Sequence, residues 1–193
     1  QQEEMRDELI RYLNVPANKV IVRYNPLDLD TINRCLAAPS PYTNENEIRI
    51  VNVARFDYVK AQDVLVKAFI FVKKKVPEAN LYLIGNFFKD NDTYIRSLEL
   101  VKKEGIEDSV HFIGFDKNPY KWVKYANCFA LSSRVEGLPN ALIEAMYLGK
   151  PILMVPAHIE QECNAFDAMQ NGAGIIDHNF NLSNLLRFSQ NYK

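Results

Sequence analysis

Residues 128–146 read CFALSSRVEGLPNALIEAM, and this stretch has the pattern of a strand, a sharp loop and a helix. The four consecutive apolar residues at 128–131 are typical of a buried strand in a parallel sheet. Gly137 marks the loop, and Pro139 suits the first turn of a helix predicted over residues 139–148. The unpaired backbone N–H groups of such a first turn, together with the helix dipole, indicate a site for an anion such as a phosphate.

Two glutamates flank this predicted anion site. Glu136 lies in the loop, and Glu144 lies about one and a half turns into the helix. A carboxylate repels a phosphate but accepts hydrogen bonds from hydroxyl groups, so both residues would suit a sugar or a ribose. An exposed loop glutamate and a surface helix glutamate explain the same pattern equally well. The residues by themselves leave both interpretations open.

The alternation of apolar runs and helical spacing extends on both sides of this stretch, from residue 48 onward. Apolar runs predict strands at residues 48–53, 81–84, 110–113, 128–131, 152–155 and 174–176. Helical spacing predicts helices at residues 61–75, 93–104, 120–125, 139–148 and 161–170. The alternation predicts an α/β fold, a Rossmann-like three-layer sandwich with a parallel, doubly wound sheet. In such a fold the ligand site lies at the carboxyl ends of the strands.

The first 45 residues have a different character. Residues 3–13 show helical spacing, and residues 19–24 alternate like a short strand. Residues 37–46 are polar and rich in turn formers, which indicates a boundary. We predict a remnant of another unit plus a linker at residues 1–45 and one compact domain at residues 46–193. The start of the chain has no signal-peptide pattern and is interpreted as a boundary inside a longer protein.

The composition is that of a soluble globular protein, with 48% hydrophobic and 24% charged residues. A formal net charge of -1 gives no electrostatic reason to expect a nucleic-acid partner. The three cysteines are widely spaced without a C-x-x-C pair, which favours buried thiols over disulfides or a zinc site. No apolar run approaches the ~20 residues of a membrane span, so we expect the cytoplasm, with the inner membrane face left open.

The run EGLPNALIEAM at 136–146, followed by GKP at 149–151, resembles the two-glutamate motif of retaining GT-B glycosyltransferases of family 4, also called group 1. Seven residues separate the glutamates, as in that family. The resemblance implies that Glu136 is a catalytic residue that contacts the donor sugar and that Glu144 holds the ribose. It further implies donor contacts for the residues between them, Gly137, Leu138, Pro139 and Asn140.

A second segment, NVARFDYVK at 52–60, resembles the part of the same domain that follows its first strand. By chemistry alone, Arg55 and Lys60 would offset phosphate charge, although such a pair is more often simply solvated. The resemblance implies that both bind the donor diphosphate. Residues 112–115 are a candidate wall for the nucleotide base, and a core role for their aromatic rings fits as well.

The resemblance covers residues 19–155 and implies one half of a GT-B fold, the half that binds a nucleotide sugar. The implied reaction transfers a hexosyl group from a UDP- or GDP-sugar, with retention of configuration, in polysaccharide or glycoconjugate biosynthesis. The acceptor, a glycan or a lipid-linked glycan, would bind to the other half, so this half is expected to be inactive alone. No cofactor and no metal are implied, because cations and a helix N-terminus stabilise the departing diphosphate.

After residue 155 the resemblance weakens. The run PAHIEQECNA at 156–165 looks more like the matching loop of other GT-B enzymes, and which of Glu160, Gln161 and Glu162 faces the donor stays open. Two alternatives remain, a GT-B nucleotide-sugar epimerase that acts on the donor alone and a non-catalytic nucleotide-binding domain. An oxidoreductase is disfavoured because no G-x-G-x-x-G follows any predicted strand.

Overall fold

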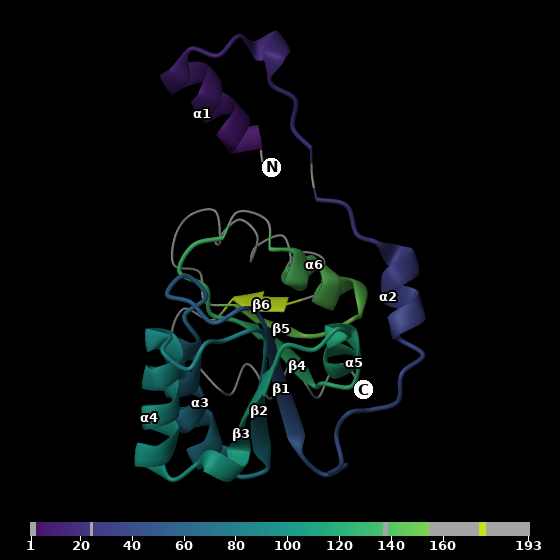
Figure 1. The fold of residues 1–193 in the computed structure, drawn as a ribbon. Helices are drawn as coiled ribbons and strands as arrows, with labels where there is room; N and C mark the ends of the chain where they lie inside the picture. Colours follow the sequence, from purple (N-terminus) through teal and green to yellow (C-terminus); the bar gives the residue numbers. More distant parts are fainter. Residues whose placement is uncertain (1–2, 24, 137–138, 155–173, 177–193) are drawn as a thin grey trace.

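The computed structural model describes residues 3–23, 25–136, 139–154 and 174–176 (Figure 1). Its strands form one parallel sheet in the order β3-β2-β1-β4-β5-β6. Their bounds are β1 (Ile48–Val53), β2 (Ala79–Ile84), β3 (Val110–Gly114), β4 (Cys128–Leu131), β5 (Ile152–Met154) and β6 (Gly174–Ile176). The predicted α/β fold with a parallel sheet is confirmed, and each strand lies within a few residues of its predicted position.

The strand order reverses at β1. Successive strands run outward from β1 through β2 to β3, and β4 then returns to the other side of β1. The loops that follow β1 and β4 therefore lead to opposite faces of the sheet. This reversal is the place where doubly wound sheets bind their ligands.

Two layers of helices cover the sheet (Figure 1). On one face lie α3 (Gln62–Lys75) and α4 (Asp92–Glu104), and on the other lie α5 (Pro119–Lys124) and α6 (Asn140–Tyr147). Side chains alternate along each strand, so Ile50 of β1 joins the core under α3, and Val51 joins the core under α5 and α6. A short 3-10 helix, η2 (Glu107–Ser109), leads into β3.

The N-terminal region contains α1 (Glu3–Leu13), η1 (Ala17–Lys19) and α2 (Leu29–Cys35). The predicted helix at 3–13 is confirmed. The predicted strand at 19–24 is wrong for its described residues, because residues 20–23 pair with no strand. An alternating pattern does not ensure that a neighbouring strand is present to form hydrogen bonds with it. The helix α2 was not predicted; Asp28 begins it, accepting a hydrogen bond from the backbone N–H of Thr31.

The two ends of this region differ in how they contact the sheet domain. Helix α1 stands apart in Figure 1, and its apolar side chains are largely exposed. Ile32 of α2 and Tyr42 are instead buried, and the Tyr42 hydroxyl donates to the backbone oxygen of Trp122 at 2.8 Å. The predicted boundary at 45/46 stays a prediction, and the predicted helix at 161–170 lies outside the described residues.

Candidate functional site

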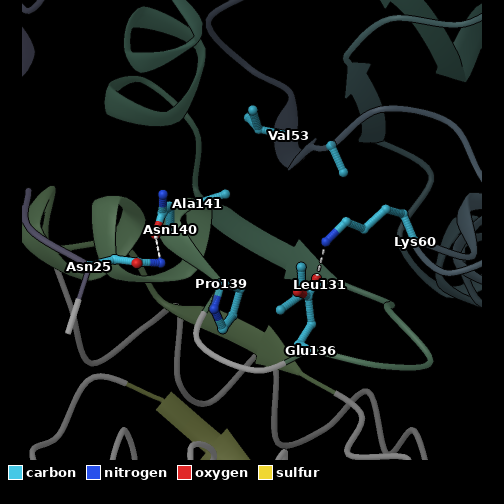
Figure 2. Close-up of a pocket in the computed structure, with 9 residues that line it drawn as sticks. Asn25, Val53, Lys60, Leu131, Glu136, Pro139, Asn140 and Ala141 are labelled. Atoms are coloured by element: carbon cyan, nitrogen blue, oxygen red, sulfur yellow. Dashed lines mark hydrogen bonds and ion pairs between the residues drawn. The ribbon is translucent and has the colours of Figure 1, made fainter. Parts of the chain in front are cut away.

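The loops after β1 and β4 meet at the strand reversal, and they bring Lys60 and Glu136 together. The Lys60 Nζ lies 2.5 Å from the Glu136 Oε1, and the Ser133 hydroxyl donates to the same oxygen at 2.6 Å (Figure 2). Glu136 is only 8% exposed. A buried carboxylate needs such partners, because leaving it unpaired would be strongly unfavourable.

A pocket of about 330 Å³ opens beside this ion pair. The residues that line it come from both loops, from the start of α6 and from the N-terminal region: Asn25, Val53, Ala54, Lys60, Leu131, Glu136, Pro139, Asn140 and Ala141 (Figure 2). Four predicted site residues, Lys60, Glu136, Pro139 and Asn140, thus share one pocket. Gly137 and Leu138 lie outside the described residues.

The β1–α3 loop is held by its own side chains. The Asp57 carboxylate accepts the backbone N–H of Lys60 at 2.8 Å and the Nε of Arg55 at 2.7 Å. Partial burial raises the pKa of Asp57, but these two hydrogen bonds and the charges of Arg55 and Lys60 outweigh it, so the pKa lies below its ordinary value. Gln62 is fully buried and donates to the backbone oxygen of Arg55 at 2.9 Å. The loop is therefore fixed before any ligand arrives.

Arg55 does not lie in the pocket. Its side chain is 77% exposed and is paired with Asp57. The structure therefore places Arg55 on the same loop as Lys60, directed to solvent, with its Nε held by Asp57.

The first turn of α6 borders the pocket through Asn140 and Ala141. The N–H groups of Leu142 and Ile143 in that turn donate to the Pro139 oxygen at 3.0 and 3.3 Å. Pro139 precedes the helix, and no side chain among the described residues caps it. The Asn140 side chain accepts a hydrogen bond from Asn25 at 2.7 Å (Figure 2). The N–H groups of a first helical turn, with the helix dipole, favour an anion at this position.

Glu144 lies further along α6, half-buried and outside the pocket lining. Burial raises its pKa, and a hydrogen bond that Tyr120 donates at 3.2 Å partly opposes that rise. Burial and the nearby Glu144 carboxylate raise the pKa of Tyr120 to about 12. The hydroxyl of Tyr120 is therefore a stable donor that orients the Glu144 carboxylate at neutral pH.

The aromatic residues at 112–115 divide between the two predicted roles. Phe112 packs edge-on against Tyr94 at 5.3 Å and in a tilted arrangement against Phe56 at 5.9 Å, half-buried against the core beneath α3 and α4. Phe115 is 72% exposed beyond the end of β3. Phe112 is thus a core residue, and Phe115 is the ring that a ligand could reach.

Two D-x-D triplets occur, and each sits at the start of a helix. Asp28 caps α2 and Asp30 lies in its first turn, while Asp90 precedes α4 and Asp92 lies in its first turn. Both pairs lie at the N-terminal end of a helix, where the helix dipole favours negative charge. Over the described ranges, no group of three His, Cys, Asp or Glu side chains gathers as metal ligands. The expectation that no metal is needed therefore depends on Lys60 and the N-terminus of α6, which would stabilise the diphosphate.

The sequence model of the family described as "Glycosyl transferases group 1" matches residues 38–176. The chain belongs to this family.

Two curated relatives illustrate the family. An uncharacterized glycosyltransferase of Methanocaldococcus jannaschii is 32% identical over 140 residues, which is 70% of this chain and 34% of the relative. The N-acetylgalactosamine-N,N'-diacetylbacillosaminyl-diphospho-undecaprenol 4-alpha-N-acetylgalactosaminyltransferase of Campylobacter jejuni is 28% identical over 140 residues, 72% of this chain and 36% of the relative. The chain thus spans about a third of the length of these relatives.

Solved structures share the fold of this group 1 glycosyltransferase domain. Anabaena HepE in complex with UDP matches with a TM-score of 0.73 and 19% identity, over 98% of this chain and 52% of that one. WaaG, a glycosyltransferase involved in lipopolysaccharide biosynthesis, matches with a TM-score of 0.60 and 16% identity, over 77% of this chain and 38% of that one. The likeness shows the fold, a Rossmann-like domain of the kind that makes up one half of a GT-B architecture. None of the described helices is long and apolar enough to cross a bilayer.

Four residues of this glycosyltransferase domain form hydrogen bonds with candidate site residues that the sequence did not predict. Asp57 and Ser133 lie within the two motifs of the sequence, but the spacing of residues does not show which polar groups form hydrogen bonds with each other. Tyr120 and Asn25 lie far along the chain from their partners Glu144 and Asn140, 24 and 115 residues away. Only the tertiary contacts identify these last two.

Proposed function

We propose that this domain is the donor-binding half of a retaining glycosyltransferase that transfers a hexosyl group from a nucleotide-diphosphate sugar. The observation that carries the proposal is the pairing of Lys60 with buried Glu136 beside the first turn of α6, at the strand reversal. A cation, a helix N-terminus and a carboxylate within one pocket match the three parts of a sugar diphosphate.

Each residue has a role in the proposal. Two parts of the site bind the diphosphate. One is Lys60, and the other is the start of α6 with the residues before it: Gly137, Leu138, Pro139 and Asn140. Arg55 joins them through the terminal nitrogens of its guanidinium, while its Nε pairs with Asp57. Glu136 accepts hydrogen bonds from the sugar hydroxyls, and Glu144, held by Tyr120, accepts them from the ribose.

The proposed reaction uses these positions. The bond between the anomeric carbon and the diphosphate oxygen breaks, and its electron pair leaves with the nucleoside diphosphate. The acceptor hydroxyl forms the new bond on the same face and gives its proton to the oxygen of the departing diphosphate. Lys60 and the α6 amides stabilise the charge that grows on the leaving oxygen, which is electrostatic catalysis.

The relatives support a nucleotide-sugar donor and a polymeric or lipid-linked acceptor. Anabaena HepE has been crystallised with UDP-glucose and with UDP, which makes UDP the first nucleotide to test. The Campylobacter relative is named for an undecaprenol-linked acceptor, and another relative, CapH of Staphylococcus aureus, for capsular polysaccharide biosynthesis. We therefore propose a glycan or lipid-linked glycan as acceptor, with the reaction in the cytoplasm or at the inner membrane face.

Calorimetric titration with UDP, GDP and their sugar conjugates tests the proposal, first without metal and then with Mg²⁺. Lys60→Ala should weaken binding of the preferred nucleotide by about 10- to 100-fold, the value of a charge-assisted hydrogen bond. Lys67→Ala, on the exposed side of α3, is the matched control and should bind as the unmodified chain does. Equal affinities in Lys60→Ala and Lys67→Ala would contradict the site.

Transfer itself is tested with the full-length protein. Product formed from the sugar nucleotide and an acceptor, with the anomeric configuration read by NMR, should show retention. Conversion of the donor sugar without any acceptor would point instead to an epimerase.

A further inference from the structure

Arg134 lies two residues before Glu136 and contacts the β1–α3 loop through backbone and side chain. Its backbone N–H donates to the Val59 oxygen at 2.7 Å, and its guanidinium donates to the Tyr58 oxygen. The guanidinium also lies over the Tyr58 ring, 4.2 Å from its centroid. One side chain thus joins the loop that carries Glu136 to the loop that carries Lys60.

The same guanidinium reaches a buried carboxylate. Arg134 Nη2 lies 3.7 Å from Asp63 Oδ1, in the first turn of α3, and Asp63 is 5% exposed. Arg96 of α4 approaches the other carboxylate oxygen at 3.4 Å. Asp63 therefore has two cationic partners, and only Arg134 belongs to a loop of the candidate site.

We propose that Arg134 is a positioning residue that fixes the separation of Lys60 and Glu136 in the donor pocket. The proposal rests on the proposed function. A planar guanidinium can donate in two directions and stack on a ring at the same time, which a lysine ammonium cannot do. A further hydrogen bond, from the Ser132 hydroxyl to the Lys60 oxygen at 2.9 Å, lies between the same two loops.

The arrangement has a consequence for the bound state. A diphosphate that binds Lys60 competes with Glu136 for the ammonium group, so the ion pair cannot by itself keep the loops together. Arg134 contacts Tyr58, Val59 and Asp63, and these contacts involve neither Lys60 nor Glu136, so they do not depend on that ion pair. Arg134 then keeps Glu136 at the sugar while Lys60 turns to the phosphate.

The test compares Arg134→Met with Arg96→Met in the full-length protein. Each substitution removes one cation from Asp63, so a purely structural role predicts similar losses of melting temperature and of activity. We expect Arg134→Met to lower kcat/KM for the donor by about 10²-fold, the effect of a misplacement of about 1 Å. Arg96→Met should change kcat/KM by less than about twofold, because the ion pair of Arg96 joins α4 to α3 and lies outside both loops.

A double-mutant cycle shows whether Arg134 acts through Glu136. Adding Arg134→Met to Glu136→Gln should cost far less in kcat/KM than adding it to the wild type, whereas Arg96→Met should be additive. Arg134→Lys keeps a cation near Asp63 but loses the planar fork, and it should stay impaired, which covers the case in which Arg134→Met does not fold. Additive losses, or equal losses in the two arginine variants, would overturn the proposal. A wild-type protein without transfer or nucleotide binding would instead refute the proposed function.

Discussion

Glu144 shows at the scale of one residue how a half-buried carboxylate can cost stability. The carboxylate is half-buried on α6, and burial raises its pKa despite the hydrogen bond from Tyr120. A carboxyl group whose pKa is higher in the folded state binds its proton more tightly there. The folded state therefore loses stability as the pH rises past the ordinary glutamate range, toward the raised folded value.

The first prediction follows from the upward shift of the Glu144 pKa. Glu144→Gln should melt at a higher temperature than the unmodified chain at pH 7, since the amide carries no charge to desolvate and still accepts from Tyr120. The difference should shrink as the pH falls below 4.5, the ordinary glutamate value, where the carboxyl is protonated in both states. Thermal melts of the ligand-free chain between pH 3 and pH 8 measure it.

An exposed glutamate provides the control for these melts. Glu99→Gln, on the solvent side of α4, should leave the melting temperature unchanged across the same pH range. A difference for Glu144→Gln that stays constant with pH would show that desolvation of the carboxylate is not its cause.

At the scale of elements, the end of β2 determines where the β1–α3 loop lies. The Ala54 N–H donates to the Ile84 oxygen at 2.9 Å, and the Gly85 N–H donates to the Gly114 oxygen at 2.9 Å. A Cβ on Gly85 would lie only 1.9 Å from the Ala54 oxygen. Gly85 therefore permits the close approach of the backbone of the neighbouring loop.

Gly85→Ala is therefore expected to destabilise the domain by more than about 2 kcal/mol, since backbone and not a flexible side chain must move. It should also weaken nucleotide binding, because the displaced loop carries Lys60. Urea denaturation and calorimetric titration measure the two effects.

Gly105→Ala is the control that separates the cost of the steric clash at Gly85 from the cost of an unfavourable backbone conformation. Gly105 has φ of 63°, and a Cβ there would meet nothing within 4 Å. Its substitution should cost only about 1–2 kcal/mol, the penalty of the left-handed conformation, and leave nucleotide binding unchanged. Equal losses at Gly85 and Gly105 would contradict the proposed contact with Ala54.

At the scale of the whole molecule, the segment before the sheet packs along α5 and α6. Asn33 accepts a hydrogen bond from Tyr147, and the Leu36 oxygen accepts one from Lys124. Ile32 is 1% exposed, and Tyr42 packs edge-on against Trp122 at 5.3 Å. These contacts favour a stable unit that includes residues 29–45.

A truncation series tests that unit and the predicted boundary together. A chain that starts at residue 46 should be less stable than one that starts at residue 25 by more than about 3 kcal/mol, because it loses two buried side chains. A chain that starts at residue 15, without the largely exposed α1, should be as stable as the full one. Equal stability of the chains starting at 46 and 25 would support the boundary at 45/46.

The sequence by itself determined the elements of the sheet and the region of the site. Runs of apolar residues and helical spacing are local signals, so strands β1 to β6 and helices α3 to α6 follow from them. The region of the site followed as well, because carboxyl ends of parallel strands share one edge. The alternating residues 19–24 show the limit, since a strand needs a partner that no local pattern supplies.

Only the tertiary structure decided which side chains meet. Lys60 and Glu136 are 76 residues apart and form one ion pair, while Arg55, in the same motif as Lys60, faces solvent. The link from Arg134 to Asp63 and the contribution of Asn25 to the pocket also join distant segments. Spacing cannot predict these contacts, because each depends on how segments far apart in the chain pack against each other.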